Sequence, residues 1–180
     1  MIQRIQTLWL VLAALLMAAG FIFPVAQYTM VDEPLNQTIS GELNLLPNKN
    51  PEMWNQKLSG ETQIEFSQAD SDFKTWPLIA LAAVTILIAI VSIFLFRNRV
   101  RQSRIVLAGF MVNLIYVFLV FFWAVDGFGN CMKAMMNIDQ FKVVWSIGAY
   151  TPIASLLLLF LAQRAIRKDE ALVRAADRLR

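Results

Sequence analysis

One cysteine and three methionines lie close together in the chain, and their sulfur atoms could ligate a soft metal ion. Cys131 is followed by Met132, Met135 and Met136, and sulfur ligands of this kind select ions such as Cu(I). Methionines at i, i+3 and i+4 are more typical of the apolar face of an amphipathic helix, where their flexible side chains fill gaps. We therefore expect packing at this position and predict no metal site and no cofactor.

The residue types that carry out most enzymatic chemistry are scarce in the sequence. Histidine is absent, which removes the commonest general base and the commonest metal ligand. The single cysteine excludes a disulfide within the chain and a paired-thiol redox site. The Gly127-Phe128-Gly129 segment after Asp126 lacks the strand context of a nucleotide-binding loop, and no pair of carboxylates stands out. We predict that the protein is not an enzyme.

Small and polar residues recur at helical spacing within the apolar parts of the sequence. They are Gly109, Asn113, Tyr116, Thr151 and Ser155, accompanied by Ala14, Ala18, Ala82, Thr85, Ala89, Ser92, Gly148 and Pro152. In lipid, small residues permit close helix contact, and polar residues bond across that contact. The face around Asn113 therefore has two interpretations: ordinary packing of a helix bundle, which we favour, or a cavity for a lipophilic or uncharged ligand. A carrier of ions or protons would be expected to place an acid or a base there, and none is present.

The last residues of the chain, Arg167–Arg180, have the pattern of an amphipathic helix with internal ion pairs. Leu172, Ala176 and Leu179 repeat on one side, and Glu170 precedes Arg174 by one helical turn. This helix could dock a cytoplasmic partner, lie on anionic lipid, or only extend the preceding helix. The candidate partner surface consists of Arg4, Arg167, Asp169, Glu170, Arg174, Asp177 and Arg178. Within it, Arg4 could reach Asp169 or Glu170.

Four long apolar segments must position all of these residues. They run over Ile5–Phe23, Pro77–Phe96, Ile105–Val125 and Val143–Ala162, and each is near the roughly 20 residues that a helix needs to cross the hydrocarbon core. None carries a charged residue in its interior. The sequence therefore predicts an all-α membrane protein with four transmembrane helices in a bundle. Cleavage of the first segment as a signal peptide is a less favoured alternative, because its apolar run is longer than that of a typical signal peptide.

The charges between these segments are segregated, although the net charge is only +3. Arginines gather in the connection Arg97–Arg104 and in the tail after Ala162, whereas acids dominate residues 24–76. Lys and Arg are retained on the cytoplasmic side during insertion. We therefore predict both termini and the Arg97–Arg104 connection in the cytoplasm. A nucleic-acid surface is a weak alternative, because insertion already explains why every arginine cluster adjoins a helix end.

Residues 24–76 form the largest hydrophilic segment, and we predict a small β-containing structure there. Ala26, Tyr28 and Met30 alternate with polar residues, and weaker alternation follows at Thr38–Leu45 and Gln63–Ser67. Pro47–Pro51 has the composition of a turn. The expected order begins with a lead and first membrane helix at 1–23 and an exported segment at 24–76. Helices two and three follow at 77–125 with a basic cytoplasmic connection, and an exported loop at 126–142 contains a short interfacial helix over Cys131–Gln140. Helix four covers 143–163, and a cytoplasmic helical tail covers 164–180.

The two ends of the chain also carry a resemblance to a known family. The opening Met1-Ile2-Gln3-Arg4-Ile5-Gln6-Thr7 and the closing Arg164–Arg180, placed around four apolar segments, resemble the bacterial domain-of-unknown-function family numbered four-two-nine-three. The resemblance covers nearly the whole chain. It implies a multi-pass protein of the bacterial inner membrane and supplies no catalytic residues.

These observations together lead to one functional expectation and one alternative. We expect a non-enzymatic interaction or accessory protein that contacts the lipid bilayer and meets a cytoplasmic or membrane partner through its cytoplasmic face. The alternative is a small carrier or binder of a lipophilic or uncharged ligand within the bundle. The pattern of residues does not favour a nucleic-acid partner.

Overall fold

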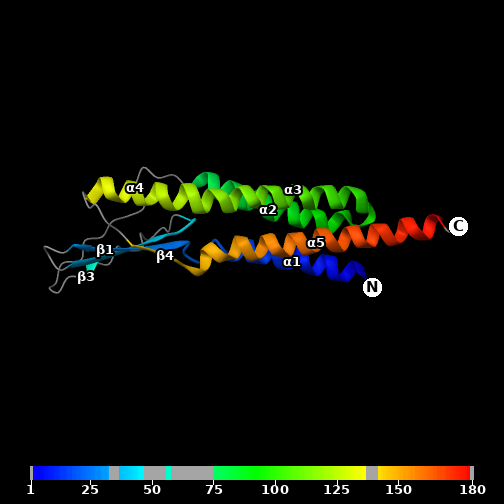
Figure 1. Ribbon diagram of the computed structural model, residues 1–180, viewed down its shortest axis with the longest axis horizontal. Coiled ribbons are helices and arrows are strands. Elements are labelled where there is room, and N and C mark those ends of the chain that lie inside the picture. The colour runs from blue at the N-terminus through cyan, green and yellow to red at the C-terminus, as the bar shows by residue number, and fades with distance from the viewer. Residues whose placement is uncertain (1, 33–36, 47–55, 58–74, 137–141, 179–180) are drawn as a thin grey trace. The chain divides into compact units, whose positions relative to one another are not determined.

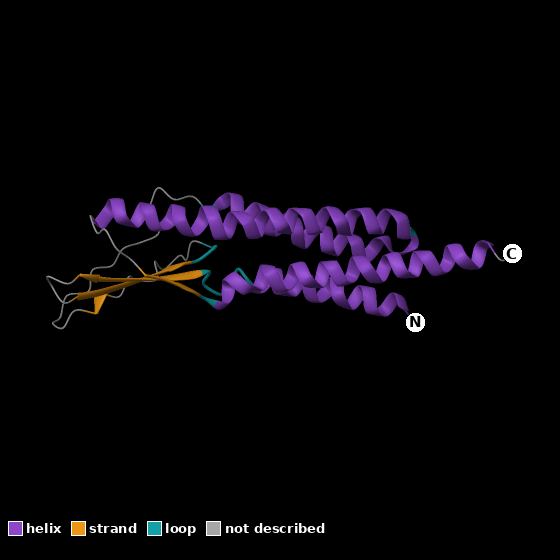
Figure 2. Cartoon of the chain, in the orientation of Figure 1, coloured by secondary structure: helices purple, strands orange, loops and turns teal. Residues whose placement is uncertain are grey.

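The computed structural model describes residues 2–32, 37–46, 56–57, 75–136 and 142–178, which fall into two compact units. Unit 1 consists of Met1–Ala19, Ala80–Val117 and Thr151–Arg180. Unit 2 consists of Gly20–Ile79 and Phe118–Tyr150. Unit 1 is helical, whereas unit 2 combines helical segments with a β-sheet (Figure 1, Figure 2).

The helices of unit 1 follow the apolar segments of the sequence. They are α1 (Ile2–Ala19), α2 (Trp76–Phe94), α3 (Arg99–Phe118) and α5 (Ile147–Arg178), with the short 3-10 helix η2 (Leu95–Arg97) between α2 and α3. Figure 1 shows the start of α1, the connection from α2 to α3 and the end of α5 at the same end of this unit. The arginine-rich connection, the start of α1 and the end of α5 therefore share one end of unit 1.

The core of unit 1 lies between α1, α3 and α5. Its members are Leu10, Ala13, Val106, Leu159, Ala162 and Ile166, none more than 1% exposed, with Trp9, Ile93, Phe110 and Leu158 packed against them. The buried side of α1 thus passes through Leu10 and Ala13, and Met17 is also buried. The prediction that Ala14 and Ala18 form the contact side of this helix is wrong, since Ala18 is exposed.

The outer surface of unit 1 is also apolar. Leu15, Leu87, Phe94 and Leu157 are among the large apolar side chains that are at least 60% exposed, as expected of helices surrounded by lipid. Three stretches, Trp76–Phe94, Arg99–Asn130 and Ile147–Val173, are long and apolar enough to cross a membrane, and the apolar helix Ile5–Ala19 is shorter. The architecture is therefore mainly helical, with three candidate spans and a small sheet.

Unit 2 contains a four-stranded antiparallel sheet in the order β3-β2-β1-β4. The strands are β1 (Ala26–Asp32), β2 (Gln37–Leu43), β3 (Gln56–Lys57) and β4 (Lys142–Trp145). Tyr28 lies opposite Gly41 on one side and Val143 on the other. The strands predicted around Ala26–Met30 and Thr38–Leu45 are confirmed. The predicted strand at Gln63–Ser67 and the turn at Pro47–Pro51 lie outside the described residues.

The boundary between the last loop and the last helix differs from the prediction. We expected the fourth apolar helix to begin at Val143, but Lys142–Trp145 forms β4, and α5 begins at Ile147. β-Branched and aromatic residues favour strands, and β1 offers them an edge with which to pair. The Trp145 ring also packs on Phe121, with ring centroids 4.6 Å apart.

The second correction concerns the expected exported loop at 126–142. In place of a helix end near Val125 and a separate short helix at Cys131–Gln140, α3 continues through the π-helical segment η3 (Leu119–Ala124) into α4 (Val125–Met136). Gly127 and Gly129 do not stop this helix, because glycine in a helix costs only about 1 kcal/mol relative to alanine. Phe128 between them is 1% exposed, and its burial offsets that cost.

Tyr28 explains why the helix continues. Its ring packs on Phe128, with centroids 5.1 Å apart, and its hydroxyl donates a hydrogen bond of 2.9 Å to the carbonyl of Val125. Burial raises the pKa of the Tyr28 hydroxyl, and the Asp126 carboxylate adds to the increase. The neutral hydroxyl is therefore a stable donor that ties β1 to α4 inside unit 2.

Candidate functional site

The intramembrane polar face predicted from the sequence is buried inside unit 1. Asn113 and Ser155 are fully buried, and Tyr116 and Thr151 are nearly so. Asn113 Nδ2 donates to the carbonyl of Pro152 over 3.2 Å, and Ser155 Oγ donates to the carbonyl of Ala13 over 3.1 Å. These bonds connect α3 to α5 and α5 to α1, so the polar atoms here hold helices to one another.

Glycine lets two helices of this face approach closely. A Cβ atom placed on Gly109 of α3 would lie 2.7 Å from Cγ2 of Ile88 on α2, which is closer than side chains tolerate. In unit 2, a Cβ atom on Gly148 would meet the carbonyl oxygens of Pro24 and Phe23 at 2.4 and 2.5 Å. Close backbone approach at both glycines is the outcome expected of packing and not of a ligand cavity.

The matching face of α2 behaves as predicted. Ala82, Thr85, Ala89 and Ser92 are all buried. The hydroxyls of Thr85 and Ser92 donate to carbonyls one turn earlier in their own helix, at Leu81 and Ile88. The hydrogen bonds of these two hydroxyls are therefore satisfied within α2, and this face needs no polar partner on the neighbouring helix.

The predicted partner surface on the tail is helical, but its members have different environments. Arg167 is exposed, Glu170 is half-buried and Asp169 is buried. The side chains of Arg4, Arg174, Asp177 and Arg178 lie outside the described ones, so the proposed contacts of Arg4 stay predictions. Leu172 and Val173 are 51% and 42% exposed, and they give this end of α5 an uncovered apolar surface.

Asp169 is paired with an arginine of the α2–α3 connection. Nη1 of Arg99 lies 2.9 Å from Oδ2 of Asp169, and the two side chains are 29% and 11% exposed. Neither atom makes a hydrogen bond of good geometry within the described residues, so the contact is one of charge. It joins the start of α3 to the end of α5.

A set of buried polar side chains that the sequence analysis did not identify lies beside this pair. Gln102 donates to the carbonyl of Ser92 over 3.0 Å, Gln163 donates to Oγ of Ser103 over 3.1 Å, and Gln6 donates to the carbonyl of Ala165 over 3.3 Å. The signal available in the sequence was the presence of glutamines within helical turns that otherwise bury apolar residues. These bonds link α1, α2, α3 and α5 at one end of unit 1.

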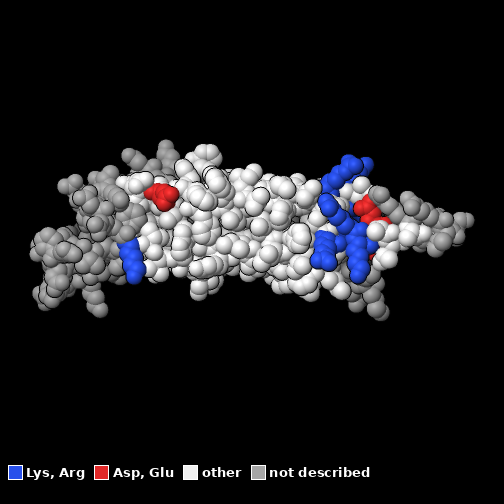
Figure 3. Space-filling view, in the orientation of Figure 1, with Lys and Arg blue, Asp and Glu red and all other residues white. Residues whose placement is uncertain are grey.

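The same end carries the described positive charge of unit 1, and we call it the charged end. It includes Arg99, Arg101, Arg104, Arg164, Arg167 and Lys168. Figure 3 shows these basic side chains gathered there, while the surface along the helices of the unit is almost free of charge. Such a division is expected of a bundle whose sides face lipid and whose end faces water.

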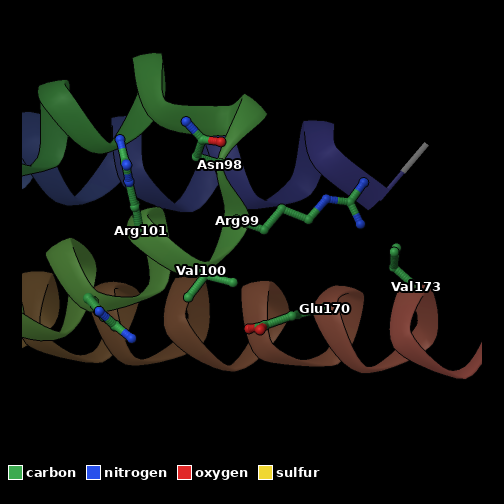
Figure 4. Close-up of a pocket in the computed structure, with 7 residues that line it drawn as sticks. Asn98, Arg99, Val100, Arg101, Glu170 and Val173 are labelled. Carbon is green, nitrogen blue, oxygen red and sulfur yellow. The ribbon is translucent and has the colours of Figure 1, made fainter. Parts of the chain in front are cut away.

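A groove of about 650 Å³ opens at the charged end. It follows the first turn of α3 and reaches the tail of α5 (Figure 4). Its lining consists of Asn98, Arg99, Val100, Arg101, Arg104, Glu170 and Val173. The arginines of this connection, interpreted from the sequence as signals for insertion alone, thus contribute three of the seven residues that line a concave surface.

The backbone at this groove reinforces the positive charge. The α3 hydrogen-bond ladder begins with the bond from Gln102 N–H to Asn98 O at 2.9 Å, and no acid lies in the first turn of the helix. The start of a helix carries about half a positive charge, and a cation near it is disfavoured by about 0.3–1 kcal/mol. Arginines at this position therefore add to the helix dipole instead of cancelling it.

Cys131 and the neighbouring methionines lie in α4, and their side chains are outside the described ones. Among the side chains that the structure does describe, no three of the types His, Cys, Asp and Glu lie close enough together to hold a metal ion.

The groove at the charged end is thus the feature of the described molecule that best combines shape with charge. Its arginines can bind anions.

Comparison with known proteins adds a family and no activity. The family model described as "Domain of unknown function (DUF4293)" matches residues 2–179. This is the family that the two ends of the chain resemble. No curated protein matches the chain.

Proposed function

Because the chain belongs to the DUF4293 family of unknown function, we propose from its own residues that it is a non-enzymatic interaction protein of the membrane, with four spanning helices and both termini in the cytoplasm. The observation that carries this proposal is the contrast in unit 1 between apolar sides and one charged, grooved end. The partner meets that end, and the bundle serves as its anchor.

The packing of α1 supports a fourth span. Leu10 and Ala13 belong to the same buried cluster as Leu159 and Ala162 of α5, which is itself long and apolar enough to cross a membrane. On its other side, Ile5, Leu8 and Leu15 are 51–60% exposed. A helix that packs along a span and exposes leucine and isoleucine outward is best accommodated in lipid.

The charge distribution supports the orientation. The connection from α2 to α3 is short and arginine-rich, and short basic connections stay on the cytoplasmic side. In a single-cysteine series made in a Cys131→Ser background, Asn98→Cys should react with a membrane-impermeant maleimide only after the inner membrane is broken. Lys142→Cys should react in cells whose outer membrane alone is permeable. The reverse pattern would contradict the proposed orientation.

The tail supplies the contact surface. At about 1.5 Å per residue, the 32 residues of α5 extend to about 48 Å, well beyond the roughly 30 Å hydrocarbon core. The excess carries the exposed Leu172 and Val173 beside the exposed Arg167. Apolar side chains set among charges are typical of the surfaces that proteins use to bind one another.

Site-specific photo-crosslinking tests the interaction. A photoreactive residue at Leu172 should yield a discrete protein adduct in native membranes, and charge reversal by Arg167→Glu should reduce that adduct severalfold. Leu157 provides a matched control, since it is a leucine of the same helix that is 60% exposed but lies in the apolar part. It should give no protein adduct. Equal adducts at both positions, or none at Leu172, would contradict the proposal.

The carrier alternative has less support. The face around Asn113 is occupied by helix contacts and by hydrogen bonds to Pro152 and Ala13. A ligand would have to displace those contacts in order to bind there.

A further inference from the structure

We infer that the groove at the charged end binds the phosphate headgroup of an anionic phospholipid. The inference goes beyond a protein-binding role, and it rests on the proposed insertion of unit 1 into a bilayer. The evidence comes from the groove's charge, from the backbone that forms its floor and from the surface directly next to it.

The lining of the groove has the charge and the donors that a phosphate requires. The lining holds Arg99, Arg101 and Arg104 with one carboxylate, that of Glu170, and Arg99 is also paired with Asp169 of α5. Guanidinium groups bind phosphate oxygens with paired hydrogen bonds. Arg101 and Arg104 are exposed, so they are available to a ligand. Arg99 is already paired with Asp169, whose Oδ2 lies 2.9 Å from its Nη1, so the two exposed arginines supply the contact with the phosphate.

The first turn of α3 contributes a second attraction for an anion. The N–H groups of Arg99, Val100 and Arg101 precede the first bond of the helical ladder, which Gln102 makes. The start of a helix attracts phosphate groups through such N–H groups and through its dipole. No acid of α3 itself occupies this turn, so its N–H groups and dipole are not neutralised from within the helix.

The surface next to the groove identifies the anion as part of a lipid. Less than one turn after Arg104, the exposed apolar strip of α3 begins, with Leu107, Met111 and Leu114 at 37%, 47% and 45% exposure. A phospholipid could place its phosphate in the groove and its acyl chains along this strip. Free phosphate would use the arginines and gain nothing from the strip. Basic pockets between membrane helices at the cytoplasmic surface bind lipid headgroups in this way.

The side chains in Figure 4 fit this division of roles. Val100 of α3 and Val173 of α5 face the gap between the two helices, and Glu170 lies beside them on α5. The two valines add apolar surface to the lining. Glu170 opposes an anion, so it limits the affinity of the site.

Binding to the purified full-length protein in a neutral detergent tests the inference. Long-chain phosphatidylglycerol should bind saturably in native mass spectrometry and raise the melting temperature. Phosphatidylcholine with the same chains should do neither, and inorganic phosphate should be at least about tenfold weaker. The double variant Arg101→Gln/Arg104→Gln should weaken phosphatidylglycerol binding about tenfold or more, since each basic residue near the lipid surface contributes roughly a factor of five.

Two further variants separate a specific site from general attraction. Arg164→Gln/Lys168→Gln removes the same charge from exposed positions of α5 that are not part of the lining, and it should weaken binding less than about threefold. Glu170→Gln should strengthen binding severalfold, because it removes the only carboxylate of the lining. Circular dichroism and size-exclusion chromatography establish that each variant is folded.

Each opposite result overturns the inference. Equal losses in the two double variants would mean that the lipid senses net charge alone, and equal binding of inorganic phosphate would make the ligand a free anion. Loss of a protein crosslink without any lipid binding would assign the groove to a protein. The outcome is independent of the orientation test, because lipid binding in detergent does not depend on which side of the membrane Asn98 faces.

Discussion

The middle of unit 1 and its charged end both bury polar side chains that donate to backbone carbonyls, and the charged end adds contacts between two side chains. In the middle, Asn113 and Ser155 donate to backbone carbonyls, and Gly109 brings α3 against α2. At the charged end, Gln163 donates to the side chain of Ser103, and Asp169 faces Arg99 at 2.9 Å. The first arrangement uses polarity for cohesion, and the second leaves charges arranged around an open groove.

This difference indicates in which of the two regions a binding surface can change without loss of the fold. A backbone carbonyl is present whatever the sequence, so the bonds in the middle depend on one side chain each. At the charged end, the Gln163–Ser103 bond and the Arg99–Asp169 contact each depend on a pair of side chains, and Arg99 also belongs to the groove lining. Substitutions in the two regions should therefore differ in the size of their effects and in whether those effects are coupled.

The largest effect is expected where the middle is tightest. Gly109→Val should lower the free energy of unfolding by about 2–3 kcal/mol, because overpacking a tight contact costs about this much and Cγ2 of Ile88 is only 2.7 Å from the new Cβ. Ala108→Val adds a comparable volume at the exposed neighbouring position and should change stability by less than about 0.5 kcal/mol. Unfolding in mixed detergent micelles measures both. Equal effects would show that Gly109 is not a point of close contact.

The positions that could be predicted from the sequence are those governed by local pattern. Helical spacing of small residues identified the buried faces of α2, α3 and α5, and alternation identified β1 and β2. The pattern failed on α1, where Leu10, Ala13 and Met17 face inward. Alanine at Ala14 and Ala18 suits either side of a helix, so its presence did not determine which side packs.

The remaining differences depend on contacts between distant residues. β4 exists because β1 pairs with it, and α4 continues through two glycines because Phe128 packs on Tyr28. Neither contact leaves a local signal in the sequence. The groove was missed for another reason: the rule for membrane insertion already accounts for Arg99, Arg101 and Arg104, so no residue pattern pointed to a second role. Only the approach of α5 to the first turn of α3 reveals that role.

An intermediate effect is expected at the Arg99–Asp169 pair. Breaking a fully buried pair costs about 3–5 kcal/mol. Because Arg99 is 29% exposed, we expect a smaller loss, about 1–2 kcal/mol, from either Arg99→Gln or Asp169→Asn. The double variant should lose less than the sum of the two, since the second substitution removes no further pair. Strict additivity in the same unfolding assay would mean that the two charges do not stabilise each other.

The smallest effect on stability is expected at Asn113, and it decides between the two interpretations of the middle. Asn113→Leu removes the bond to the Pro152 carbonyl, and hydrogen bonds between membrane helices average only about 0.6 kcal/mol. It also removes the buried Oδ1 atom, which has no hydrogen-bond partner among the described residues, and leaving such an acceptor unsatisfied costs about 1–3 kcal/mol. The second term at least offsets the first, so Asn113→Leu should not lower the free energy of unfolding. If this face only packs helices, the Leu172 crosslink and the lipid affinity of the groove should both match the unsubstituted protein. A variant of normal stability that had lost either property would show that Asn113 acts through something other than packing, and the carrier interpretation would regain its support.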